Sequence, residues 1–245
     1  MALLGMLVAL VPVTAKADQT SSDTSTELLC SNYEATPPFI AAGVMPSTHI
    51  ILDNSGSMHE FAYQESFNAT KGYTGYFDRY SYYSYDSSGQ YFYKNNTEGG
   101  WSGNFLNWVS MHRIDIARDV LTGGQYNVDS SGNYFLTVEK TDGVEDDDRG
   151  RSKYFPNEEF LDINGNTRYM TPYENNLFFR FPEKGEDNLE LWRYISNEGW
   201  EYIGSGILRV KVDEEPQGVV DNINDRMRLS LFVFDDDGMT NSGGK

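Results

Sequence analysis

The stretch that decides the fold is His49-Ile50-Ile51-Leu52-Asp53-Asn54-Ser55-Gly56-Ser57-Met58. Its first part is a continuous β-branched and aliphatic run, which is typical of a strand buried on both faces of a parallel sheet. Asp53 then lies at the carboxyl end of that strand. In open α/β sheets ligands bind at this edge, because the loops there are free of strand pairing. The sequence therefore predicts an α/β fold with a functional loop directly after the strand.

Three oxygen-bearing side chains alternate in this loop and can converge on one point. They are Asp53, Ser55 and Ser57. Hard divalent cations such as Mg²⁺ and Ca²⁺ prefer oxygen ligands, and one carboxylate with two hydroxyls leaves positions open for water or for a carboxylate of a partner. The alternative is an ordinary turn, since Asp, Asn, Ser and Gly are the commonest turn residues. The loop is thus either a metal site or a plain turn.

The pattern Asp-x-Ser-Gly-Ser-Met after a buried strand resembles the metal-ion-dependent adhesion site of von Willebrand factor type A domains. In that family the first Asp and both Ser hydroxyls reach the metal, which corresponds to Asp53, Ser55 and Ser57 here. The resemblance implies a partial Rossmann-like sheet, in which a second buried strand at residues 229–234 lies beside the first. It also implies that a Thr and an Asp from later loops complete the metal shell, so these 245 residues should bind Mg²⁺, Ca²⁺ or Mn²⁺ weakly, at roughly millimolar affinity.

Composition limits the classes of partner. The 19 Lys and Arg residues against 37 Asp and Glu residues give a formal net charge of −18. Such a surface repels nucleic-acid phosphates and anionic lipid and attracts cations. We therefore expect no nucleic-acid partner.

Cys30 is the single cysteine of the sequence, so no disulfide can form within it.

The amino-terminal residues predict export. Residues 1–17 contain an apolar stretch too short to span a bilayer, followed by Ala15-Lys16-Ala17, which has the form of a signal-peptidase site. A buried helix or strand is the competing interpretation of this stretch. Residues 18–36 are polar and rich in Ser and Thr, which is typical of a disordered lead-in. We expect a secreted protein without a membrane span.

Residues 37–124 are predicted to form the first part of the type A-like domain. Within them, Met111–Leu121 shows helical spacing of its apolar residues, and Gly123 with Gly124 should end the helix in a left-handed cap. His112 is predicted to be a partly exposed residue of this helix rather than a ligand or base, because no other His or Cys lies at metal-binding spacing.

Residues 125–220 are predicted to form a β-rich insertion, and residues 221–245 to continue the type A-like domain and to break off within it. Turns at Asp86–Gly89 and Asp129–Gly132 should each close a β-hairpin, with glycine at positive φ. Asp162–Asn166 is expected to be a hairpin turn rather than a calcium loop, because the twelfth position is Tyr173 instead of Glu. The predicted strands of the insertion are Tyr134–Glu139, Glu159–Leu161, Arg168–Met170, Leu177–Phe181, Leu191–Ile195 and Ile207–Val212.

Several motifs together resemble the amino-terminal region of PilY-type type IV pilus proteins. They are Pro37-Pro38-Phe39, Leu52-Asp53-Asn54-Ser55-Gly56-Ser57-Met58, Gly99-Gly100-Trp101-Ser102-Gly103-Asn104-Phe105-Leu106-Asn107-Trp108 and Met111-His112-Arg113-Ile114-Asp115 with Leu121-Thr122-Gly123-Gly124. The resemblance implies a role in type IV pilus assembly and surface attachment. It also implies minor pilins and a host or abiotic surface ligand as partners, and a location at the pilus tip, in the periplasm or at the outer membrane.

Two other functions remain open. Trp and Tyr residues that are expected at the surface, together with many carboxylates, also fit a secreted carbohydrate-binding or carbohydrate-active protein. A glycosidase needs a pair of carboxylates at a defined separation, and a sequence does not give that separation. A purely structural pilus subunit, whose metal only stabilises the fold, is the third. The sequence contains no G-x-S-x-G elbow, zinc motif or phosphate loop. We therefore expect a binding protein and not an enzyme.

Overall fold

The computed structural model describes residues 45–95, 99–139, 152–156, 158–181, 188–223 and 226–233. This part of the chain is mixed α/β, with most elements in sheets and few in helices. The predicted signal peptide, the lead-in, Cys30 and the residues after 233 lie outside it. Within the described ranges, no helix has the length and apolar character needed to cross a bilayer.

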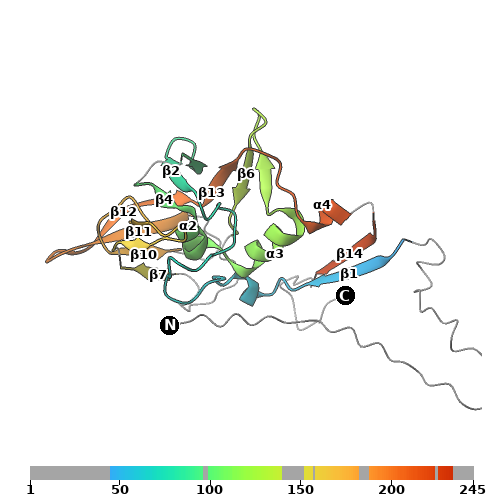
Figure 1. The fold of residues 1–245 in the computed structure, drawn as a ribbon, viewed down its shortest axis with the longest axis horizontal. Helices are drawn as coiled ribbons and strands as arrows, with labels where there is room; N and C mark the ends of the chain where they lie inside the picture. Colours follow the sequence, from blue (N-terminus) through green and yellow to red (C-terminus); the bar gives the residue numbers. More distant parts are fainter. Residues whose placement is uncertain are drawn as a thin grey trace, which may run out of the picture. The chain divides into compact units, whose positions relative to one another are not determined.

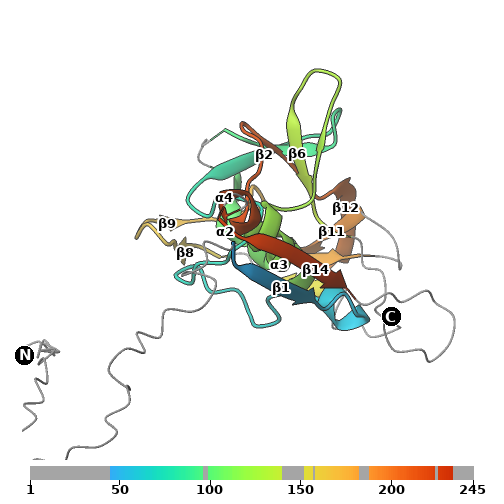
Figure 2. The ribbon, with the colours of Figure 1, turned by 90° about the vertical axis from the view of Figure 1, so that its right-hand side faces the viewer.

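The predicted metal-site strand and its predicted neighbour pair with each other. β1 (Ser47–Leu52) and β14 (Arg228–Val233) form a two-stranded parallel sheet in which Ile50 lies opposite Leu231. Figures 1 and 2 both show the two strands side by side. The expected pairing is therefore confirmed. A wider type A-like sheet stays a prediction, since the described residues add no third strand to this pair.

The prediction that these two strands are buried is wrong for the described chain. Ile51 is 71% exposed and Phe232 is 54% exposed. Among the described residues, none from β1 or β14 belongs to the hydrophobic core. The reason is that pairing two strands satisfies main-chain hydrogen bonds, whereas burying a sheet face requires a second layer packed against it. An apolar run thus predicts a strand but not the layer that covers it.

The largest sheet has six strands in the order β4-β2-β3-β13-β6-β5. They are β2 (Tyr82–Asp86), β3 (Tyr91–Lys94), β4 (Trp101–Ser102), β5 (Tyr126–Val128), β6 (Tyr134–Thr137) and β13 (Arg209–Val212). Both predicted hairpins are confirmed, because β2 pairs with β3 and β5 pairs with β6. Gly132 has the expected positive φ of 83°, whereas Gln90 (55°) rather than Gly89 adopts it in the first turn. β13 pairs with β3 and with β6. The sheet therefore combines strands from before and after residue 124, where the predicted type A-like part ends and the predicted insertion begins.

A second, antiparallel sheet has the order β12-β11-β10-β7. Its strands are β7 (Ser152–Phe155), β10 (Leu177–Arg180), β11 (Asn188–Ile195) and β12 (Gly199–Ile207). The short strands β8 (Phe160–Leu161) and β9 (Thr167–Arg168) form a separate hairpin. Asp162 Oδ1 accepts the backbone N–H groups of Asn164 at 2.9 Å and Asn166 at 2.8 Å, so this turn is the predicted hairpin turn. The β-rich character of this segment is confirmed, although β7 and β12 were absent from the predicted strands.

The described helical segments are short. They are the 3₁₀-helix η1 (Gly56–His59) and the α-helices α2 (Gly103–Ser110), α3 (Arg113–Thr122) and α4 (Val219–Ile223). The predicted helix corresponds to α3, and Gly123 ends it with a left-handed φ of 77°, as expected. A separate helix, α2, precedes it, and the Ser102 hydroxyl caps α2 by accepting the Phe105 N–H at 3.4 Å.

The expectation that His112 is partly exposed is wrong. Its ring is fully buried and stacks on Phe61 with 5.3 Å between the ring centroids. His112 is the N-cap residue of α3, and its Nδ1 lies 3.3 Å from Asp115 Oδ2. The equally buried Asp115 also accepts the backbone N–H groups of His112 at 3.0 Å and Glu139 at 2.9 Å. These contacts fix the start of α3, which is why the ring turns inward.

Two buried asparagines of α2 hold a segment of irregular backbone at residues 71–78. Asn104 accepts the Tyr73 N–H at 2.8 Å and donates to the Lys71 carbonyl oxygen at 2.8 Å. Asn107 accepts the Phe77 N–H at 3.0 Å and donates to the carbonyl oxygens of Tyr73 at 3.0 Å and Phe77 at 2.7 Å. The two side-chain amides thus supply hydrogen bonds that secondary structure would otherwise provide.

The core around α2 is mainly aromatic. The centroid of the Phe105 ring lies 4.5 Å from that of the Phe155 ring and 5.6 Å from that of the Phe179 ring, so α2 packs against the four-stranded sheet. Lys153 of β7 points into the same core. Its Nζ donates to the Trp108 carbonyl oxygen and lies 4.3 Å from the ring centroid of Phe61. Burial lowers the pKa of Lys153 well below its ordinary value of 10.5.

Candidate metal site and apolar cavity

The structure brings the three predicted metal ligands together at the carboxyl end of β1. Asp53 Oδ1 accepts the Ser55 backbone N–H at 2.8 Å, and the hydroxyl oxygens of Ser55 and Ser57 lie 3.2 Å apart. All three side chains are exposed. The Ser55 backbone amide, followed by the Ser55 hydroxyl, lowers the pKa of Asp53 below its usual range. The carboxylate is therefore charged at neutral pH.

The start of α3 anchors this loop. The Arg113 guanidinium donates to the Ser57 carbonyl oxygen at 3.0 Å and forms an ion pair with Glu60 at 3.0 Å. The Arg113 backbone N–H donates to the Glu60 carbonyl oxygen at 3.1 Å, so the main chains also meet here. These contacts hold the loop to a rigid element. Because Arg113 is paired with Glu60, its positive charge is largely balanced near the candidate cation site.

The donor set fits a hard divalent cation. One carboxylate and two hydroxyls supply oxygen ligands, and their exposure leaves room for water or for a partner's carboxylate. The described residues contain no group of three or more His, Cys, Asp and Glu side chains arranged to hold a metal. A cation here would therefore depend on the serine hydroxyls and on a single protein charge, and affinity falls with so few ligands. The metal role of these residues stays a prediction.

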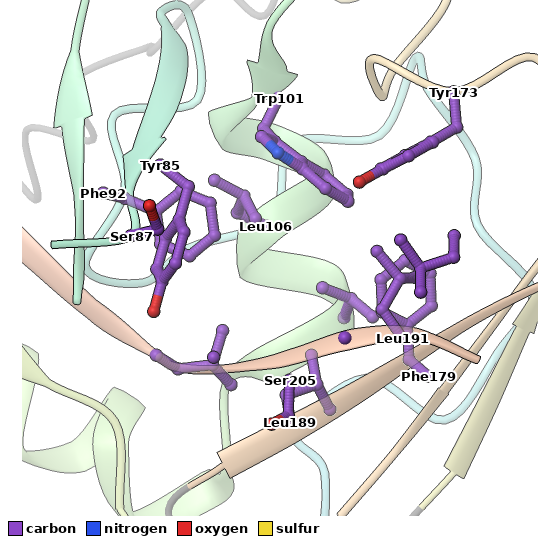
Figure 3. A pocket seen from close by; sticks show the side chains of 15 residues that line it. Tyr85, Ser87, Phe92, Trp101, Leu106, Tyr173, Phe179, Leu189, Leu191 and Ser205 are labelled. Carbon is purple, nitrogen blue, oxygen red and sulfur yellow. The ribbon is translucent and has the colours of Figure 1, made fainter.

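An apolar cavity of about 340 Å³ lies between the two larger sheets and α2 (Figure 3). Trp101, Tyr173 and Tyr85 line it together with Leu191 and Phe179, and Figure 3 shows these side chains around one common space. A cavity of this size and lining can accept an apolar ring or an aliphatic group.

Two glycines of β12 border this cavity, and they differ: Gly204 leaves open space, whereas a Cβ at Gly206 would meet the Tyr85 hydroxyl oxygen at 2.8 Å. Gly206 and Gly204 lie opposite Leu189 and Leu191 of β11, and cross-strand partners point to the same face of a sheet. A Cβ at Gly204 would meet no atom within 4 Å, so the space a side chain would fill stays open. The pairing shifts by one residue between Tyr202 and Gly204, which leaves Ile203 as the extra residue of a β-bulge beside the cavity. The alternating glycines at 204 and 206 are the feature of the sequence that could have pointed to this cavity.

Comparison with known families identifies the class of protein. Residues 64–194 match the family model described as PilY1 homolog, small alpha/beta domain. This segment is more than half of the chain, so the chain belongs to that family. The matched segment begins after the Asp53 loop and includes α2, α3 and most strands of the two larger sheets.

A similar protein is the type IV pilus biogenesis factor PilY1 homolog of Xylella fastidiosa (strain Temecula1), which is 40% identical over 77 residues. The alignment covers 25% of this chain and 6% of that protein, so the chain spans only a small part of the relative's length. No solved structure matches the chain.

Proposed function

We propose that this chain is part of a type IV pilus protein that takes part in pilus biogenesis and surface attachment. The observation that carries the proposal is the match of residues 64–194 to the PilY1 homolog family. The Xylella relative is named as a type IV pilus biogenesis factor, which supports the same association. The proposed protein is secreted and acts at the cell surface, at the pilus tip, or in the periplasm and at the outer membrane.

In this proposal attachment depends on a divalent cation held by Asp53, Ser55 and Ser57. Asp53 provides the ligand charge, and the 3.2 Å approach of the two serine hydroxyl oxygens supports a shared site. Arg113 positions the loop by holding the Ser57 carbonyl oxygen. A bound Mg²⁺, Ca²⁺ or Mn²⁺ would offer a positive charge to a carboxylate of the partner.

The proposed protein works by binding and not by catalysis. Its proposed partners are minor pilins of the type IV pilus and a ligand on a host or abiotic surface. The net charge of −18 opposes nucleic acid as a partner.

Asp53→Ala is expected to abolish the response of the chain to divalent cations. With a dissociation constant of roughly 1 mM, a cation at about tenfold higher concentration stabilises the native chain by about 1.4 kcal/mol. The variant should lose this gain, because the single carboxylate of the site is removed. Thermal unfolding in Mg²⁺, Ca²⁺ or Mn²⁺ and in EDTA measures the effect.

Asp129→Ala is the matched control. Asp129 accepts the Ser131 backbone N–H at 2.8 Å in a similar Asp-initiated turn, but it lies in the β5–β6 hairpin. This variant removes an equal charge and should keep the full cation response. An undiminished response in Asp53→Ala would contradict the metal assignment.

A cell assay separates attachment from assembly. In a strain carrying Asp53→Ala in the full-length protein, pili should still assemble while surface attachment falls. Loss of pili together with attachment would instead favour a structural subunit whose metal site only stabilises the fold.

A further inference from the structure

The outer face of the four-stranded sheet carries an aromatic surface that the proposed metal site does not use. Side chains of one strand alternate between the two faces, and Phe155, Phe179 and Leu189 fill the inner, core face. The intervening positions therefore point outward. We call the following set the aromatic face: Tyr154, Phe178, Trp192, Tyr194, Trp200 and Tyr202.

The strand register places these residues next to one another. Phe178 lies opposite both Tyr154 and Trp192, Trp192 lies opposite Tyr202, and Tyr194 lies opposite Trp200. All four strands of the sheet thus contribute to one continuous surface. In Figure 1 the strands β7, β10, β11 and β12 lie in succession.

Trp200 is the centre of the aromatic face. Its ring centroid lies 5.5 Å from that of Tyr194, 5.9 Å from that of Phe178 and 6.1 Å from that of Tyr154. Trp192 and Tyr202 form a second pair with 5.1 Å between their centroids. The rings support one another at tilted or edge-to-face angles, so the surface is preorganised rather than a set of separate side chains.

Four of the six side chains of the aromatic face remain open to solvent despite their mutual packing. Tyr154 is 51% exposed, Tyr202 48%, Trp200 45% and Tyr194 42%. A contiguous exposed patch of large aromatic side chains marks a binding surface, because leaving it in water is unfavourable.

The chemistry of the face selects the ligand. The face of an aromatic ring is electron-rich, so it attracts the weakly positive C–H groups that line one side of a pyranose ring, while Tyr and Trp add polar tips. Arg180 and Glu190 are cross-strand partners on the same outer side, and they offer hydrogen bonds with no net charge. Trp192 Nε1 donates to Glu190 at 3.2 Å, which ties these polar groups to the rings.

Charge disfavours the other polymers that stack on aromatic rings. Single-stranded nucleic acid uses such platforms, but only within positively charged grooves. A net charge of −18 opposes both nucleic acid and acidic polysaccharides. We therefore propose that the aromatic face binds a neutral, extended polysaccharide, such as a β-linked glucan or chitin-type chain, independently of the Asp53 loop.

The test measures binding of cellohexaose and of hexa-N-acetylchitohexaose to the whole chain by calorimetric titration in EDTA. At least one of them should bind, and Trp200→Ala should weaken that binding by about tenfold or more, since the central stacking partner is lost. Tyr154→Ala, on the other edge strand of the sheet, should weaken binding as well, whereas Trp200→Phe should keep most of it.

Tyr80→Ala is the matched control. Tyr80 is 59% exposed but belongs to none of the four strands. This variant should bind as tightly as the native chain, and thermal unfolding verifies that all variants are folded.

The proposal would be overturned if neither oligosaccharide binds, if the native chain and Trp200→Ala bind with equal affinity, or if an acidic alginate oligosaccharide binds equally well. It would also be overturned by self-association that Trp200→Ala abolishes, which would assign the face to a second copy of the chain. Binding that occurs in Mg²⁺ or Ca²⁺ but disappears in EDTA and in Asp53→Ala would also overturn it, while leaving the proposed metal site intact.

Discussion

Asn107→Ala is expected to lower the free energy of unfolding by about 4 kcal/mol. The Asn107 amide hydrogen-bonds three backbone groups in the interior, namely the Phe77 N–H and the carbonyl oxygens of Tyr73 and Phe77. Alanine satisfies none of them, and each unsatisfied buried group costs about 1–3 kcal/mol. Because alanine is the better helix former, the loss cannot come from α2 itself. Urea denaturation measures the change.

Two further variants make this prediction specific. Asn104→Ala removes two hydrogen bonds instead of three and should cost less than Asn107→Ala. Asn127→Ala changes an exposed asparagine of β5 and should stay within about 0.5 kcal/mol of the native chain. Equal, small effects of Asn107→Ala and Asn127→Ala would show that the two amides of α2 do not hold residues 71–78.

Lys153→Met is expected to change how stability depends on pH. Burial lowers the pKa of Lys153 in the folded chain well below 10.5, while the Glu65 carboxylate acts in the opposite direction. Between the folded and the unfolded pKa, the unfolded chain therefore carries a proton that the folded chain lacks. The native chain gains stability as pH rises through this window and loses about 1.4 kcal/mol for each pH unit that the pH falls within it.

The variant has no group at this position to protonate. The stability of Lys153→Met relative to the native chain should therefore increase as pH falls from about 10 toward neutrality. Lys94→Met removes an exposed lysine paired with Asp78 and serves as the control for loss of a surface charge. Urea denaturation at several pH values gives the comparison. A difference between Lys153→Met and the native chain that stays constant with pH would disprove the assignment.

Local signals allowed much of the fold to be predicted. The turn at Asp129–Gly132 specifies its hairpin within a few residues, and Gly123 ends α3 where the helical spacing stops. The burial of His112 could not be predicted in this way. It depends on the stacking of its ring on Phe61 and on its place beside Asp115, and the first of these contacts joins residues far apart in the sequence.

The candidate sites also differ in whether residues close together in the sequence are enough to predict them. Asp53, Ser55 and Ser57 lie within one turn, so their proximity can be predicted from spacing alone. The aromatic face cannot, because Tyr154 and Trp200 belong to different strands and meet only through the register of the whole sheet. The cavity depends similarly on glycines of one strand facing leucines of the next.

The pairing of β1 with β14 has a consequence for the order of assembly. The Thr48 hydroxyl donates to Met227 Sδ at 3.5 Å across 179 positions of sequence. Until β14 docks, β1 lacks its partner strand, and the Asp53 loop has only its contacts with the start of α3. Closing so long a loop is entropically costly until the intervening sheets have folded and brought its ends together. The Asp53 loop therefore reaches its final geometry late, after the aromatic core around α2 has formed.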